Sequence, residues 1–244
     1  MVKERSMTNP KRGWMHRNWF PGSRPALLLV SLFLLLAIYP GFEQGEPVAG
    51  MSGHRMSGLV LHILFTLILL GAAWLVHDRR GTFVVSCLLA GPWIVLGWLD
   101  HFMDFSNPLE GAVTLFFAAT TLYVALSQVR FILRAKKVDA DLLCRAVSVY
   151  LLLGVAWMAL YGATALFVPG SFHADKALLH GPDGLLGFSD LLYYSFTTLS
   201  TLGMGDIAPV SSFARSLTLL ECILGPLYLA ILLARLVAMY GRQR

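Results

Sequence analysis

Charged residues are scarce in this sequence, and their scarcity excludes most soluble folds. Only 14% of the 244 residues are charged, whereas 57% are hydrophobic and the mean hydropathy is +0.67. A soluble domain carries about 25% charged residues, so too little polar surface remains here to cover a globule in water. The basic residues stand in short patches between apolar runs. This arrangement is typical of a polytopic membrane protein and does not predict a nucleic-acid partner.

Cysteine is also scarce, and paired metal-binding histidines are lacking. The three cysteines, Cys87, Cys144 and Cys222, lie in or beside apolar runs and form no CxxC pair, so no disulfide framework is predicted. His62 is the one histidine within a predicted span, and no nucleophile constellation is visible. These absences disfavour the alternative of a membrane-embedded enzyme or haem protein, and no cofactor is expected.

Long apolar runs dominate what is present. Six of them are long enough to cross a bilayer, which takes about 17–25 residues of helix: Pro25–Phe42, Ser57–Val76, Thr82–Leu99, Gly111–Gln128, Ala146–Val168 and Ser212–Val237. The expected fold class is therefore an all-α membrane protein with six transmembrane helices. The basic leader before the first run also fits a cleaved signal peptide, but its length favours a retained span.

The distribution of lysine and arginine predicts the orientation. These residues gather on the cytoplasmic side of membrane proteins. With the N-terminus inside, the six spans leave only Arg55, Lys176 and Arg215 of the 19 basic residues on the outer side. Both termini are therefore predicted to be cytoplasmic, in an integral protein of the plasma (inner) membrane. The segment from Pro169 to Val210 is then external.

That external segment carries the candidate chemistry. From Phe188 to Pro209 it reads FSDLLYYSFTTLSTLGMGDIAP, in which Ser189 and Asp190 are N-cap candidates for about three turns of helix. The following residues alternate glycine with residues that carry side chains. Gly203 and Gly205 can adopt φ > 0, so that successive carbonyls aim at one axis and replace the water of a dehydrated cation. The pattern predicts an ion path.

The stretch resembles the pore loop of tetrameric potassium channels, whose filter is typically Thr-Val-Gly-Tyr-Gly-Asp. The matching positions are Thr201, Gly203, Gly205 and Asp206. The resemblance implies a re-entrant pore helix between spans five and six, supported by Tyr193, Tyr194, Thr197 and Thr198. It also implies passive conduction of K⁺, which would bind at Thr201, Leu202, Gly203 and Met204.

Two departures from the family pattern lie within this filter. Leu202 replaces valine conservatively, whereas Met204 replaces an aromatic residue. Methionine is flexible and has no ring with which to brace the filter, so a weakly selective monovalent cation channel remains an alternative. One chain supplies one loop, a quarter of a ring, and a homotetramer in membrane lipid is expected.

The last apolar run contains three further candidates. Gly225 follows Asp206 at the spacing of the family's gating hinge, and Pro226 is expected to kink the helix beside it. Glu221 is an intramembrane acid, which predicts a functional role. Two interpretations stay open: support of the filter through Thr197, Thr198 or Tyr194, or an acid of the cavity or an interface.

The remaining segments complete the predicted organisation. The span Gly111–Gln128 contains no arginine, and Arg130 and Arg134 come only at its end, so no voltage sensor is expected. His173 and His180 are interpreted as solvated loop residues. The predicted parts are a basic cytoplasmic segment (1–24), a four-helix transmembrane region (25–134), a cytoplasmic linker (135–145) and a pore domain (146–240).

Overall fold

The structure is a computed structural model that describes residues 23–43, 62–71, 80–103, 107–174 and 186–241. Its long helices are α1 (Ser23–Glu43), α3 (Arg80–Met103), α4 (Asn107–Arg134), α5 (Ala140–Phe167) and α7 (Ser212–Gly241). A short helix, α6 (Phe188–Leu199), stands between α5 and α7. A further helical stretch covers His62–Gly71. The fold is mostly helical, as the apolar runs predict.

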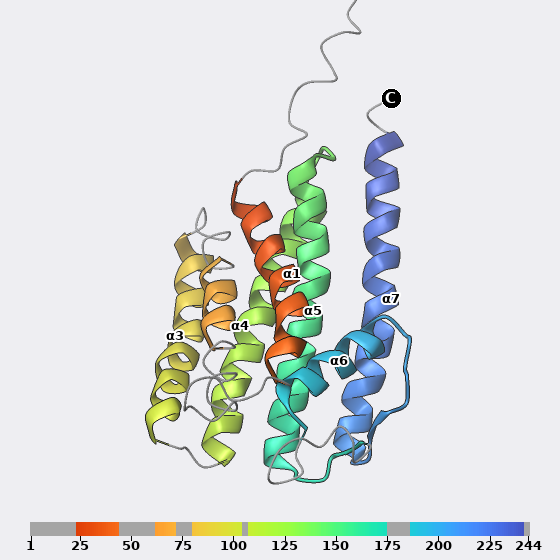
Figure 1. Cartoon of the computed structure of the whole chain (residues 1–244). Helices are drawn as coiled ribbons and strands as arrows, with labels where there is room; N and C mark the ends of the chain where they lie inside the picture. Colours follow the sequence, from red (N-terminus) through yellow and green to blue (C-terminus); the bar gives the residue numbers. More distant parts are fainter. Residues whose placement is uncertain (1–22, 44–61, 72–79, 104–106, 175–185, 242–244) are drawn as a thin grey trace, which may run out of the picture.

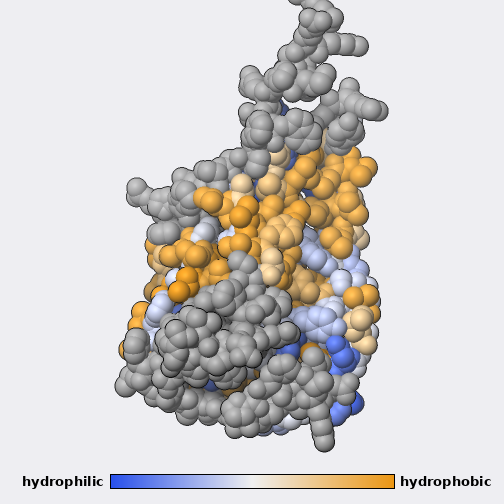
Figure 2. Space-filling view, in the orientation of Figure 1, coloured by the Kyte–Doolittle hydropathy of each residue, from blue (hydrophilic) through white to orange (hydrophobic). Residues whose placement is uncertain are grey.

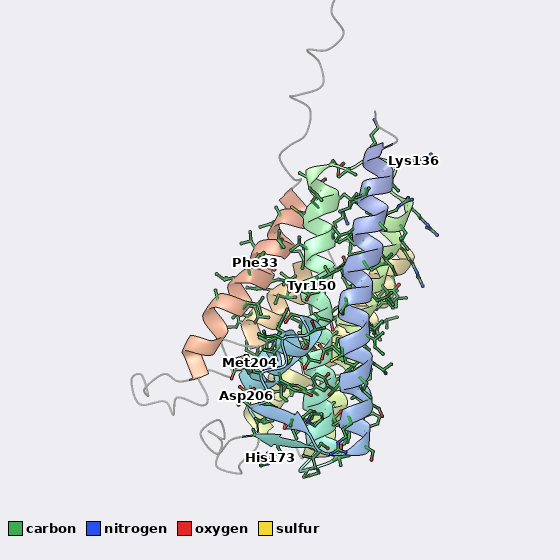
Figure 3. All side chains as sticks on the ribbon, turned by 90° about the vertical axis from the view of Figure 1, so that its right-hand side faces the viewer. Phe33, Lys136, Tyr150, His173, Met204 and Asp206 are labelled. Carbon is green, nitrogen blue, oxygen red and sulfur yellow. The ribbon has the colours of Figure 1, made fainter. Side chains whose placement is uncertain are left out.

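The helix α5 lies in the middle of the molecule, between the N-terminal helices and the pair α6 and α7 (Figure 1). It packs along α4 and contacts α1, α6 and α7, while α3 packs on α4. The ribbon reverses direction from α3 to α4, again to α5, and again to α7 (Figure 1). Lys136, between α4 and α5, and His173, beyond α5, mark opposite ends of the molecule (Figure 3).

Among the described residues, three helices are long and apolar enough to cross a membrane: Leu109–Arg134, Ala140–Phe167 and Ser212–Met239. The described parts of the first three predicted spans form the shorter apolar helices Pro25–Ala37, His62–Gly71 and Val84–Leu99. Apolar side chains also cover the surface. In α1, Leu28, Leu32 and Leu35 are fully buried, while Phe33 projects outward (Figure 3). A helix that is apolar on all sides is typical of a membrane segment.

The helix α5 begins within the predicted linker 135–145. The helix α4 continues to Arg134, and α5 already begins at Ala140, which leaves only residues 135–139 between them. The cause is an N-cap: the Asp139 carboxylate accepts a hydrogen bond from the Leu142 N–H at 2.9 Å. Such a cap satisfies a backbone donor that the first helical turn leaves unpaired.

Two short strands were not expected in an all-α fold. The strands β1 (Phe172–Ala174) and β2 (Ile207–Pro209) pair in antiparallel register, with His173 opposite Ala208. The Ser171 carbonyl extends the pairing by accepting from the Val210 N–H at 2.8 Å. The chain segment that follows the filter is thereby joined to the segment that follows α5.

Hydropathy divides the surface of the described residues. Hydrophobic side chains form a broad band over the upper part of the molecule, and hydrophilic ones gather toward the end that carries β1 and β2 (Figure 2). The band includes α7, where Leu219, Ile223, Leu233 and Val237 are each more than half exposed. Such a band is unfavourable in water and favourable in lipid.

Candidate ion-conduction site

The short helix α6 begins two residues earlier than a cap at Ser189 would allow. Its N-cap is Gly187, and the Asp190 carboxylate reaches back to accept from the Gly187 N–H at 3.0 Å. Ser189 and Asp190 therefore lie inside the first turn, and the prediction that they cap the helix is wrong. Asp190 still favours this end, because a carboxylate in the first turn satisfies a free N–H and complements the helix dipole.

Beyond α6 the backbone folds back on the helix end. The N–H of Thr201 donates to the Thr198 carbonyl at 2.9 Å, and those of Leu202 and Gly203 donate to the Thr197 carbonyl at 2.8 and 3.1 Å. In a trans peptide the N–H points opposite to the preceding carbonyl. The carbonyls of Ser200, Thr201 and Leu202 therefore all point away from α6.

Alternate residues of the predicted filter have positive φ. The angles are 61° at Thr201, 53° at Gly203 and 84° at Gly205. A Cβ at either glycine would meet no heavy atom within 4 Å. These two positions therefore favour glycine because of their positive φ and not because a side chain would clash. For a β-branched threonine this conformation is strained. The alternation predicted from the two glycines thus extends back to Thr201.

The filter residues face outward from the single chain. Residues 201–205 are all exposed, with Leu202 at 65% and Met204 at 63%. Met204 and Asp206 lie between α6 and the β1–β2 pair (Figure 3). Among the hydrogen bonds of the described residues, none ends on the carbonyls of residues 201–204. These oxygens are available to a ligand.

Asp206 is tied to α6 at the outer end of the filter. Its carboxylate interacts with the Tyr193 phenol of α6. The same carboxylate accepts from the Ile207 N–H at 3.0 Å. Of the four predicted pore-helix residues, Tyr193 thus contacts the filter through its side chain, and Thr197 and Thr198 contact it through their carbonyls.

Packing against α5 positions α6. The Ser195 hydroxyl oxygen lies 2.8 Å from the Gly154 carbonyl oxygen. A Cβ at Gly154 would come within 2.6 Å of the Phe196 ring. Glycine at this position of α5 is therefore what permits the close approach of α6.

Packing against α7 positions the other side of α6. A Cβ at Gly225 would overlap the backbone carbonyl of Leu199, the last residue of α6. The Tyr194 hydroxyl bonds the Thr218 hydroxyl at 2.8 Å. The helix α7 continues through Pro226 to Gly241, so Gly225 lies within a continuous helix. Because glycine has no Cβ, it leaves room there for the end of α6. The hinge role of Gly225 and Pro226 remains a prediction.

Glu221 is fully buried where α5, α6 and α7 meet. Its carboxyl group bonds the Tyr161 hydroxyl of α5 at 2.5 Å and the Ser195 hydroxyl of α6 at 2.6 Å. The predicted bonds to Thr197, Thr198 or Tyr194 are wrong. Tyr194 instead turns its hydroxyl to Thr218 and packs its ring on Tyr161, with ring centroids 5.0 Å apart.

Several residues of this site were missed by sequence reasoning. Tyr161 and Phe172 were missed; with the predicted Tyr194 they form a three-ring cluster that joins α5, β1 and α6. Gly154, Ser195 and Thr218 complete the contacts around α6. A tyrosine inside an apolar run is a signal for Tyr161, because a buried hydroxyl needs a partner. No local pattern distinguishes Gly154 from other glycines.

The predictions for other residues have mixed outcomes. His62 stacks on Trp93, with ring centroids 4.4 Å apart, which places it in an aromatic cluster. His173 is exposed on β1, whereas His180 lies outside the described residues. Arg130 and Arg134 occupy the last turns of α4, away from its middle.

The comparisons with known proteins concern the C-terminal part of the chain. Residues 149–242 match the family model described as "Ion channel". The match indicates an ion-channel domain in this C-terminal part of the chain. This domain runs from within α5 to the end of α7 and contains α6 and the filter. It identifies a transport protein and not an enzyme. No curated protein and no solved structure matches the chain.

Proposed function

We propose that the protein is a potassium-selective channel in which residues 201–206 form the selectivity filter. Backbone carbonyls of residues 201–204 and the Thr201 hydroxyl replace the hydration shell of K⁺. The observation that carries this proposal is the alternation of positive φ at Thr201, Gly203 and Gly205. Together with the N–H groups turned toward Thr197 and Thr198, it directs the carbonyls to one side.

The channel is proposed to be a homotetramer. A single chain leaves its filter exposed and most of α7 uncovered, and one loop cannot surround an ion. Four copies around an axis would close the ring and cover part of the apolar surface of α7. Gel filtration with light scattering of the detergent-solubilised chain tests this state. A monomer as the conducting species would contradict it.

The six-span topology also belongs to this proposal. The reversals from α3 to α7 and the shorter apolar helices agree with six crossings (Figure 1). The strand β1 before α6 pairs with the strand β2 after it, which suits a re-entrant pore helix with an external mouth. Both termini are then cytoplasmic, in the plasma (inner) membrane, and residues 25–134 form an accessory region around the pore domain.

Rubidium uptake into liposomes tests conduction. The full chain is expected to carry Rb⁺ in a barium-sensitive manner, and Gly203→Ala is expected to reduce uptake to background. Gly170→Ala is the matched control, because Gly170 also has positive φ, 80°, with open space around it, but lies outside the filter. Equal loss in both variants would show general strain and contradict the filter assignment.

A weakly selective cation channel is the second candidate. The Met204 side chain is 63% exposed in the chain, and methionine braces a filter less rigidly than an aromatic ring does. Reversal potentials under bi-ionic K⁺ and Na⁺ conditions separate the two candidates. A potential far from zero supports potassium selectivity. A potential near zero that Met204→Tyr moves away from zero supports the weakly selective channel.

A further inference from the structure

Within the described part of the chain, the buried carboxyl group of Glu221 has only neutral hydroxyl groups as its hydrogen-bond partners. Tyr161 and Ser195 supply them from α5 and α6. The ionisable groups that interact with it electrostatically are Tyr150 and Tyr161 on α5, Tyr194 on α6 and Cys222 on α7. All of these are neutral acids when protonated, so none supplies a positive charge. A carboxylate here would be buried without a counterion, which is strongly unfavourable.

The hydrogen bonds of Ser195 are a second, independent reason why an ionised Glu221 is unfavourable. Its hydroxyl oxygen lies 2.6 Å from a Glu221 oxygen and 2.8 Å from the Gly154 carbonyl oxygen. A hydroxyl group has one proton, and a carbonyl or carboxylate can only accept. If Glu221 were ionised, one of the two contacts would have no proton between its oxygens.

A proton on Glu221 satisfies all three contacts. Glu221 then donates to Ser195, Ser195 donates to the Gly154 carbonyl, and Tyr161 donates to the second carboxyl oxygen. Each group has its full set of partners, and the chain of bonds links α7 to α6 and α6 to α5. Linked hydrogen bonds in a buried site stabilise one another.

We propose that Glu221 is a neutral carboxylic acid whose proton fixes α6 between α5 and α7. This makes Glu221 a positioning residue for the filter and rests on the proposed function. Ser195 stands two positions before Thr197, the residue whose carbonyl receives the N–H groups of Leu202 and Gly203. A shift of α6 at Ser195 therefore moves the acceptor that orients the filter carbonyls.

The isosteric amide separates a neutral acid from a charged one. Glu221→Gln replaces the acid O–H by an N–H that donates to Ser195, and its carbonyl still accepts from Tyr161. We expect its rubidium uptake to stay within about twofold of the wild type. Glu221→Ala leaves Ser195 and Tyr161 without their partner, and uptake should fall at least about tenfold. Uptake as low in the glutamine variant as in the alanine variant would overturn the proposal.

Infrared difference spectroscopy on the solubilised full chain detects directly whether the Glu221 carboxyl group is protonated. The wild-type spectrum minus that of Glu221→Gln should show the carbonyl stretch of a carboxylic acid at neutral pH. Glu110→Gln, which removes a glutamate of α4, is the matched control and should leave this band in place. Carboxylate bands in the Glu221 difference spectrum would overturn the proposal. If the wild type carried no Rb⁺, the channel assignment would fail, while the spectrum would still decide the charge of Glu221.

Discussion

The helices α5 and α7 are similar in length and composition but differ in their surroundings. Each offers a 28-residue apolar segment that is long enough to cross a membrane. In α5, 67% of the most apolar window is buried within the chain, whereas in α7 only 11% is. Hydropathy measures the preferred solvent of a segment and does not reveal its protein neighbours.

The difference follows from the number of elements around each helix. The helix α5 is surrounded by α1, α4, α6 and α7. The helix α7 is buried only along a narrow stripe that includes Ala214, Glu221, Gly225 and Met239. These positions recur at the three- and four-residue spacing of one helix face. In the proposed tetramer, lipid and other copies of the chain cover what remains.

The largest expected difference between α5 and α7 is the loss of stability caused by the same leucine-to-alanine change in each helix. Leu152 of α5 is fully buried, whereas Leu233 of α7 is 61% exposed. Leu152→Ala should lower the free energy of unfolding of the monomer in detergent by about 2–5 kcal/mol. Leu233→Ala should change it by less than about 0.5 kcal/mol. A comparable loss in both variants would contradict the burial difference.

The next effect concerns the stripe where α7 contacts α6. Gly225→Ala places a Cβ against the Leu199 carbonyl, and such overpacking costs about 1–3 kcal/mol. We expect lower thermal stability and a large decrease in rubidium uptake, because the end of α6 must move. Gly241→Ala, in open space on the same helix, should change neither. A Gly225→Ala variant with normal stability and altered open probability would favour a gating hinge at Gly225 over a role in packing against α6.

A smaller effect is expected where α7 meets α4. Arg235 donates to the carbonyls of Leu133 and Ala135 at 2.8 and 3.1 Å, at the end of α4 where the helix dipole favours a cation. Arg235→Ala should destabilise the chain by about 1–2 kcal/mol. Its control is Arg215→Ala, which removes one exposed bond to the Pro209 carbonyl and should cost less. Equal melting temperatures for the two variants would contradict a specific role for Arg235.

The smallest effect lies at the start of α5. Asp139→Ala removes the N-cap bond to Leu142 and should cost about 1 kcal/mol of stability. Asp139→Asn keeps an accepting oxygen and should restore most of the loss. Urea or thermal unfolding in detergent measures both variants. If asparagine were as destabilising as alanine, the capping explanation for this helix start would be wrong.

Prediction from sequence succeeded where the cause is local. The apolar runs that become α4, α5 and α7 were located because transfer into lipid depends on composition along a short window. The start of α5 at Ala140, within the predicted linker 135–145, was not located, because this stretch is polar and charged. Asp139 gives a local capping signal there that was not used.

Prediction failed where residues far apart in the chain meet. The partners of Glu221 depend on the register of α5 against α7, and the residues of the Tyr161–Glu221 bond are 60 positions apart. The pairing of β1 with β2 joins segments on either side of α6. Neither contact leaves a periodic pattern, because each involves only one or a few residues on each side.

The sequence by itself determined a membrane-embedded helical chain with a glycine-alternating segment before its last helix. Both features follow from properties of single residues, namely apolar transfer free energy and the freedom of glycine to adopt positive φ. Three features became visible only in the tertiary structure. Gly225 makes room for the end of α6, and Glu221 forms hydrogen bonds to α5 and α6. The most apolar part of α5 is mostly buried within the chain, whereas that of α7 is not. Packing decides these outcomes, because close approach and hydrogen-bond pairing depend on which surfaces meet in three dimensions.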